Sequence, residues 1–216
     1  MIKAVIFDLD GLMVDSEPVH FKAYEKVLHE LGVTLSEDDY AKRYIGIADR
    51  ETAQDMVKRY KLPISFEELL RRKALLFAQL LPGNVVPKNG LFGLLHDLRT
   101  HEYKTAVASG AMLPDIKQII ASLNLQESFD ALCSADSVKQ GKPAPDLFLF
   151  AAQQIGVLPQ NCLVLEDAPV GVQAAQSAGM KCYAIPSRET QGRDFSKAIK
   201  VLTSLSEVFN EIKQEK

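Results

Sequence analysis

The sequence predicts an α/β protein with a parallel, doubly wound sheet and a helical segment inserted after the first strand. Three observations support this fold class. Residues 2–7 form a near-continuous apolar run, typical of a strand buried on both faces. Residues 17–81 show helical periodicity and no clear strand pattern. From residue 91 onwards, short apolar runs alternate with helical patterns, as in a sheet whose parallel strands are joined by helices.

The first strand ends in two carboxylates, in the tetrapeptide Asp8-Leu9-Asp10-Gly11. Open α/β sheets bind their ligands at the carboxyl ends of the strands. Two acids held close together there repel each other, and a cation between them would relieve that repulsion. Gly11 allows a sharp turn or a close approach of the backbone to another group. Without further evidence, an ordinary Asp-Gly turn is an equally good interpretation.

The inserted segment is predicted to be a small helical bundle. Apolar residues at positions 24, 27, 28 and 31 form one helical stripe, which Gly32 ends. Asp49 is expected to cap a second helix that continues to residue 60. Ser65 and Glu68 have capping-box spacing and open a third helix, and a short helix over 38–44 completes the bundle. The turn-forming residues 82–90 predict a linker back to the sheet.

The second half of the chain supplies the remaining elements of the sheet domain. We expect strands at 104–108, 130–133, 163–165, 181–185 and 198–202, and helices at 91–100, from Pro114, at 145–155, 170–178 and 207–213. A proline in the first turn starts two of these helices, and glycine ends two of them.

Composition excludes several classes of protein. The 216 residues are 47% apolar with a net charge of -3, which indicates an ample core and no nucleic-acid-binding surface. Cys133, Cys162 and Cys182 lie in apolar surroundings without CxxC spacing, so we expect buried, reduced thiols rather than metal ligands. No apolar stretch approaches the length of a membrane span. We therefore expect a cytoplasmic protein, monomeric, without a nucleic-acid or membrane partner.

Polar groups follow three further predicted strands. They are Ser109-Gly110, where a hydroxyl and backbone N–H groups can cradle an anion, Gly141-Lys142-Pro143, and Glu166-Asp167, which suits a hard cation. Each has a commonplace explanation as a helix cap, a solvated lysine or a pair of acids at a helix N-terminus. Together with Asp8 and Asp10 they should converge, because parallel strands present their carboxyl ends at one edge.

These four motifs, in this order and approximate spacing, resemble the haloacid dehalogenase superfamily, specifically its phosphatase and phosphomutase branch with a helical cap. The resemblance spans the whole chain. It implies a Rossmann-like core formed by residues 1–15 and 82–216, and a four-helix cap domain formed by residues 16–81. It also implies a magnesium-dependent mechanism with an aspartyl-phosphate intermediate.

The same resemblance implies roles for individual residues. Asp8 would be the nucleophile, and Asp10 the general acid and then the general base. Ser109 and Lys142 would bind the phosphate oxygens, with Gly11 and Gly110 beside the substrate. Mg²⁺ would be held by Asp8, Asp167 and the backbone carbonyl of Asp10, with Glu166 a direct or an outer partner ranked below Asp167. The acid at Asp10 disfavours dehalogenation, which needs no proton donor for the leaving group.

The cap is expected to set the substrate. His20 on the first cap helix, Gly46 in a specificity loop, and Arg50 just after it are candidates for substrate contact. We expect a phosphatase acting on small phosphorylated metabolites, sugar phosphates among them. The alternative is a β-phosphoglucomutase-like mutase, although Ile45 stands where such members usually carry a basic residue. A non-catalytic metabolite-binding protein is a third reading, which the intact acids disfavour.

Overall fold

A computed structural model describes residues 1–45 and 47–215 of the chain. Its central element is a six-stranded sheet in the order β5-β4-β1-β6-β7-β8, in which every neighbouring pair is parallel. The strands are β1 Ala4–Phe7, β4 Lys104–Ser109, β5 Ala131–Ser134, β6 Cys162–Glu166, β7 Lys181–Ala184 and β8 Lys200–Val201. The predicted parallel, doubly wound α/β fold is confirmed.

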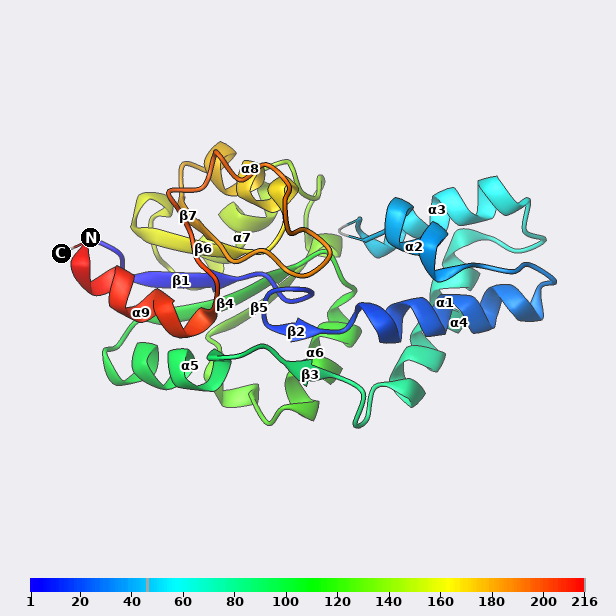
Figure 1. The fold of residues 1–216 in the computed structure, drawn as a ribbon, viewed down its shortest axis with the longest axis horizontal. Helices are drawn as coiled ribbons and strands as arrows, with labels where there is room; N and C mark the ends of the chain where they lie inside the picture. The colour runs from blue at the N-terminus through cyan, green and yellow to red at the C-terminus, as the bar shows by residue number, and fades with distance from the viewer. Residues whose placement is uncertain (46, 216) are drawn as a thin grey trace.

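Helices cover both faces of the sheet (Figure 1). On one face lie α5 Leu91–Thr100, α6 Leu113–Ser122 and α9 Leu205–Gln214, which pack against Val5 and Phe7 of β1. On the other face lie α7 Asp146–Gln154 and α8 Pro169–Ser177, which pack against Ala4 and Ile6. Successive residues of a strand point to opposite faces. An uninterrupted apolar run is therefore what a strand between two helical layers requires, and all four residues of β1 are buried.

At strand β1 the order in which successive strands are added to the sheet changes sides. From β1 the sheet extends through β4 and β5 on one side and through β6, β7 and β8 on the other. The loops that follow β1, β4 and β6 leave the same edge of the sheet beside one another. Such a switch point is where open α/β sheets form their ligand-binding crevice.

Four helices follow β1 and form the cap: α1 Glu17–Glu30, α2 Glu37–Arg43, α3 Asp49–Tyr60 and α4 Phe66–Leu80. They have an apolar core of their own, which includes Tyr24, Leu28, Met56 and Leu69. The expected cap of α4 is confirmed, since Ser65 Oγ accepts a hydrogen bond from the Glu68 N–H at 3.3 Å. The exact division into domains at residues 16 and 82 stays a prediction.

Two expectations for the cap were wrong. Asp49 does not cap α3: Ala48 is the N-cap residue, and the Asp49 carboxylate bonds to Tyr24 and Lys73. The stretch 82–90 is not a plain linker, because β3 Val86–Pro87 pairs antiparallel with β2 Val14–Asp15. The two crossings between sheet and cap thus run together as a short ribbon (Figure 1). Local sequence gives little sign of a two-residue strand whose partner is so distant.

Other sequence expectations can be compared with the structure. The three cysteines are free and buried, as expected. His29, His96 and His101 are exposed. Within residues 1–45 and 47–215, no helix is both long enough and apolar enough to cross a bilayer.

Candidate active site

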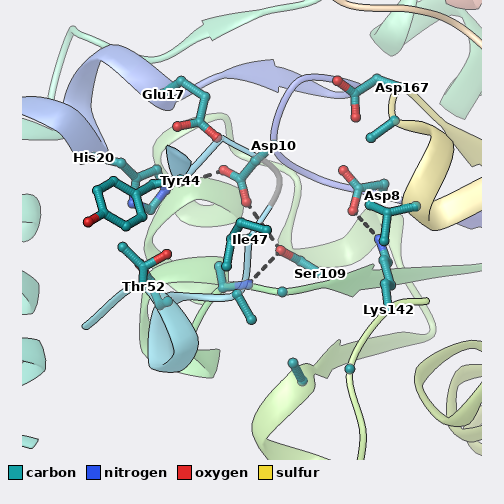
Figure 2. A pocket seen from close by; sticks show the side chains of 18 of the residues that line it. Asp8, Asp10, Glu17, His20, Tyr44, Ile47, Thr52, Ser109, Lys142 and Asp167 are labelled. Atoms are coloured by element: carbon teal, nitrogen blue, oxygen red, sulfur yellow. Dashed lines mark hydrogen bonds and ion pairs between the residues drawn. The ribbon is translucent and has the colours of Figure 1, made fainter. Parts of the chain in front are cut away.

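A pocket lies between the carboxyl edge of the sheet and the cap (Figure 2). The sheet side supplies the polar groups that the sequence singled out, namely Asp8, Asp10, Ser109, Gly110, Lys142, Glu166 and Asp167. The cap side supplies Glu17, His20, Tyr40, Tyr44, Ile47, Asp49 and Thr52. The four motifs therefore meet at one place, as their positions after the strands predicted.

Lys142 joins two carboxylates on the sheet side. Its ammonium group forms ion pairs with Asp8 and with Glu166, the latter at 2.6 Å from Oε1. Burial raises the pKa of Asp8 well above its usual value, and the charges of Glu166 and Asp167 raise it further, while Lys142 lowers it. The sequence suggested that Lys142 directly follows a strand, and this expectation was wrong. Lys142 lies on the loop between the 3₁₀ helix Ala135–Ser137 and α7.

Asp10 is held by three side chains, two from the start of α1 and one from the end of β4. Its Oδ1 accepts a hydrogen bond from Ser16 and lies 3.4 Å from Nε2 of His20, and its Oδ2 accepts one from Ser109 at 3.2 Å. Burial tends to raise the pKa of Asp10, but the contacts with His20 and Ser16 outweigh it and lower the pKa to about 2. Asp10, which is partly buried, and His20, which is buried, form a pair that can share one proton.

Three acids on the sheet side fit a divalent cation. Carboxylate oxygens of Asp8, Glu166 and Asp167 lie within 4.8 Å of one another, and oxygen donors of this kind are preferred by Mg²⁺. Burial, followed by the charge of Glu166, raises the pKa of Asp167 to about 7. One lysine among three acids leaves excess negative charge, which a cation would neutralise. Glu166 is already engaged, because its oxygens bond to Lys142 and to the Ala168 N–H, which supports ranking it below Asp167.

Two glycines make room for these acids. Gly11 has φ +91°, and a Cβ atom there would lie 2.2 Å from Oδ2 of Asp167. A Cβ atom at Gly171, in α8, would lie 1.8 Å from Oε1 of Glu166. Contacts this short are not possible, so any side chain at either position would displace a carboxylate of the cluster. The close backbone approach predicted for Gly11 is confirmed.

The cap contributes residues that the sequence interpretation missed. Tyr40 donates a hydrogen bond to Oε2 of Glu17 at 3.1 Å, and both line the pocket. Glu17, which is the first residue of α1, was not singled out from the sequence. Asp49 had looked like a helix cap. A signal that could have indicated Glu17 is its place at the start of the first cap helix, close in the chain to the strand end that carries Asp10.

Not every predicted cap residue reaches the pocket. His20 does, stacked on Phe77 with ring centroids 4.3 Å apart. Arg50 does not line the described pocket, since it is exposed and its guanidinium lies 5.3 Å from the ring centroid of Phe66. Its position in α3 directs it away from the site. Gly46 lies outside the described residues.

Comparisons with known proteins agree with this geometry. A family model described as haloacid dehalogenase-like hydrolase matches residues 5–185. The chain is 30% identical over 219 residues to a phosphorylated carbohydrates phosphatase of Thermotoga maritima, with 99% of each chain covered. It is 31% identical over 188 residues to the β-phosphoglucomutase of Bacillus subtilis, covering 83% of this chain and 81% of the relative.

A solved structure extends the likeness to the whole fold. The crystal structure of CbbY from Rhodobacter sphaeroides in complex with phosphate superposes with a TM-score of 0.90 at 26% identity, over 96% of each chain. The chain therefore belongs to the haloacid dehalogenase-like hydrolases, in the branch that contains phosphatases and β-phosphoglucomutase, and it is a phosphoric monoester hydrolase.

Proposed function

We propose that the protein is a magnesium-dependent phosphatase that hydrolyses small phosphorylated metabolites, sugar phosphates in particular, through an aspartyl-phosphate intermediate. The observation that carries the proposal is the pairing of Asp8 with Lys142 and of Asp10 with His20 at the floor of one pocket. This arrangement supports Asp8 as the nucleophile and Asp10 as the proton donor, because each carboxylate has a basic side chain as its own partner.

In the first half-reaction, a carboxylate oxygen of Asp8 attacks phosphorus and the bond from phosphorus to the leaving oxygen breaks. Lys142 orients Asp8 and offsets the repulsion between carboxylate and phosphate. Ser109 and the backbone beside Gly110, which line the same pocket, would bind the phosphate oxygens. Asp10 delivers the proton that it shares with His20 to the leaving oxygen, which departs as an alcohol.

In the second half-reaction, water attacks the phosphorus of phospho-Asp8. The bond from phosphorus to the Asp8 oxygen breaks, and the proton from water passes to Asp10. The low pKa of Asp10 keeps it ionised at neutral pH, which is the form that accepts a proton. Its contact with His20 then allows the pair to hold that proton for the next turnover.

The acids Asp8 and Asp167 and the backbone carbonyl of Asp10 would hold Mg²⁺. Bound there, the ion would neutralise negative charge that builds up as carboxylate and phosphate approach. The excess of carboxylates over cations at this position supports the assignment. Glu166 would act by fixing Lys142.

Release of phosphate from a generic aryl phosphate in the presence of Mg²⁺ tests the proposal. Asp8→Asn should abolish turnover, whereas Asp97→Asn, the same change in α5 away from the pocket, should leave it unchanged. Rapid acid quenching with labelled substrate should place the label on the peptide that contains Asp8. Retained turnover in the Asp8→Asn variant would refute the assignment of the nucleophile.

A phosphomutase is the second candidate, favoured by the likeness to the B. subtilis enzyme. A mutase that works through a sugar bisphosphate must hold a second phosphate in the cap. Ile45 lines a second pocket, which adjoins the one that holds Asp8. Its side chain is uncharged and cannot form an ion pair with a second phosphate. Interconversion of glucose 1- and 6-phosphates, with little phosphate release, would establish the mutase instead.

A further inference from the structure

We propose that the leaving group of the substrate is uncharged and hydroxyl-bearing, and that the Glu17 carboxylate selects against substrates that carry a second anionic group. The inference rests on the proposed phosphatase function and names the class of substrate for the same pocket. Its basis is the charge of the cap wall, meaning Glu17, Tyr40, Tyr44, Ile47, Asp49 and Thr52.

The cap wall contains acids, hydroxyls and an apolar side chain, and the one base that the described cap residues add to the pocket is His20. Lys142 and His20 are the two side chains of the described pocket lining that can carry positive charge. Lys142 is paired with Asp8 and Glu166, and His20 with Asp10. Both cations therefore serve the end of the pocket where the phosphate reacts.

A lysine behind the cap wall is also neutralised. Lys73 of α4 is 1% exposed, and its Nζ lies 2.8 Å from Oδ2 of Asp49 and 2.8 Å from Oδ2 of Asp115. Asp115 belongs to α6 of the core. One ammonium between two carboxylates leaves this triad with a formal charge of -1, so Lys73 offers no positive potential to a bound ligand.

Glu17 completes the negative side of the pocket. Its carboxylate accepts a hydrogen bond from Tyr40, and no basic side chain within the described part of the chain forms an ion pair with it. A carboxylate in this setting can accept further hydrogen bonds from the hydroxyl groups of a sugar or polyol. It repels a carboxylate or phosphate that enters the same space, and partial burial limits the screening of that repulsion.

An adjoining pocket, which Glu17 also lines, contains Arg193. The same pocket is lined by four acids, Asp10, Glu17, Asp167 and Glu189, so its one arginine gives no net attraction for an anion. Arg193 is exposed, and it does not line the pocket that holds Asp8.

Two substrates that differ only in charge test the inference. Glucitol 6-phosphate and 6-phosphogluconate share one carbon chain and differ at C1, which is a hydroxymethyl group or a carboxylate. At pH 8, above the pKa of about 7 to which burial raises Glu17, kcat/KM should be higher for glucitol 6-phosphate by about tenfold or more. Glu17→Gln should bring the two values within about threefold.

Glu25→Gln, the same change on the exposed face of α1, is the matched control and should leave the ratio as in the wild type. Equal kcat/KM for both compounds, or a preference that survives in Glu17→Gln, would overturn the inference while leaving the phosphatase function in place.

Binding to the Asp8→Asn variant by calorimetry separates the two proposals further. If the wild type hydrolyses neither compound but the variant binds glucitol 6-phosphate about tenfold more tightly, the inference stands and the proposed hydrolysis fails. Absence of binding for both compounds would overturn the inference.

Discussion

Replacing Lys73 by methionine should destabilise the protein by about 3 kcal/mol near pH 8. Methionine keeps an apolar stem of similar length and removes the ammonium group, which lies 4.6 Å from the ring centroid of Phe77, so the main loss is the ammonium charge. The change leaves Asp49 and Asp115, which are 8% and 0% exposed, facing each other with carboxylate oxygens within 4.8 Å. Two unit charges at that spacing repel by about 3 kcal/mol at an effective dielectric constant of ~20, in the range found when buried ion pairs are broken.

Urea unfolding at pH 8 and pH 5 measures this effect. In Lys73→Met the pKa of Asp115, which burial already raises, would rise further above its unfolded value. A carboxyl group with a raised pKa is most favourable to folding when protonated, so the loss should shrink as the pH falls to 5. A loss below about 1 kcal/mol at pH 8, or one that does not change with pH, would refute the reasoning.

Asp115→Asn is the companion variant. It keeps an oxygen for Lys73 and removes one of two buried negative charges, so the remaining pair is neutral. Oδ1 of Asp115 already lacks a hydrogen-bond partner among the described residues. The variant should lie within about 1 kcal/mol of the wild type. The double variant Lys73→Met/Asp115→Asn should regain most of what the single lysine change loses.

Three further predictions concern the site. Gly171→Ala should lower kcat at least about tenfold, because the Cβ atom of the new alanine must displace Glu166 and with it Lys142. Gly93→Ala, in α5, is the control and should keep full activity, because nothing lies within 4 Å of the added Cβ atom. Because burial raises the pKa of Glu17 from 4.5 to about 7, its ionisation opposes folding as the pH rises through this window. The free energy of unfolding of wild type and Glu17→Gln should be measured by denaturation from pH 4 to 8. Over this range the variant should gain up to about 3 kcal/mol of stability relative to the wild type. A difference between the two proteins that does not change with pH would contradict the assignment. Chelation should abolish phosphate release and Mg²⁺ should restore it, and activity that persists in chelator would exclude the cation from the reaction.

Local sequence predicted the elements that local forces decide. The apolar run of β1 indicated a strand buried on both faces, and Ser65 indicated the start of α4, because burial and capping depend on residues a few positions apart. The convergence of Asp8 with Asp167 also followed from sequence, since the alternation of strands and helices implies a parallel sheet. Its carboxyl ends then share one edge.

Long-range contacts decided the rest. Asp49 was assigned to a helix cap because its neighbours allow it, yet it binds Lys73, 24 positions away, and closes a charge triad with Asp115 of the core. The ribbon of β2 and β3, and the place of Glu17 on the cap wall, likewise depend on segments that meet only after folding. The sequence by itself determined which polar groups the sheet edge carries, because groups that follow parallel strands lie at the same edge. The charge of the opposite wall was decided by tertiary structure, because whether a lysine is available or already neutralised depends on which acids are buried beside it.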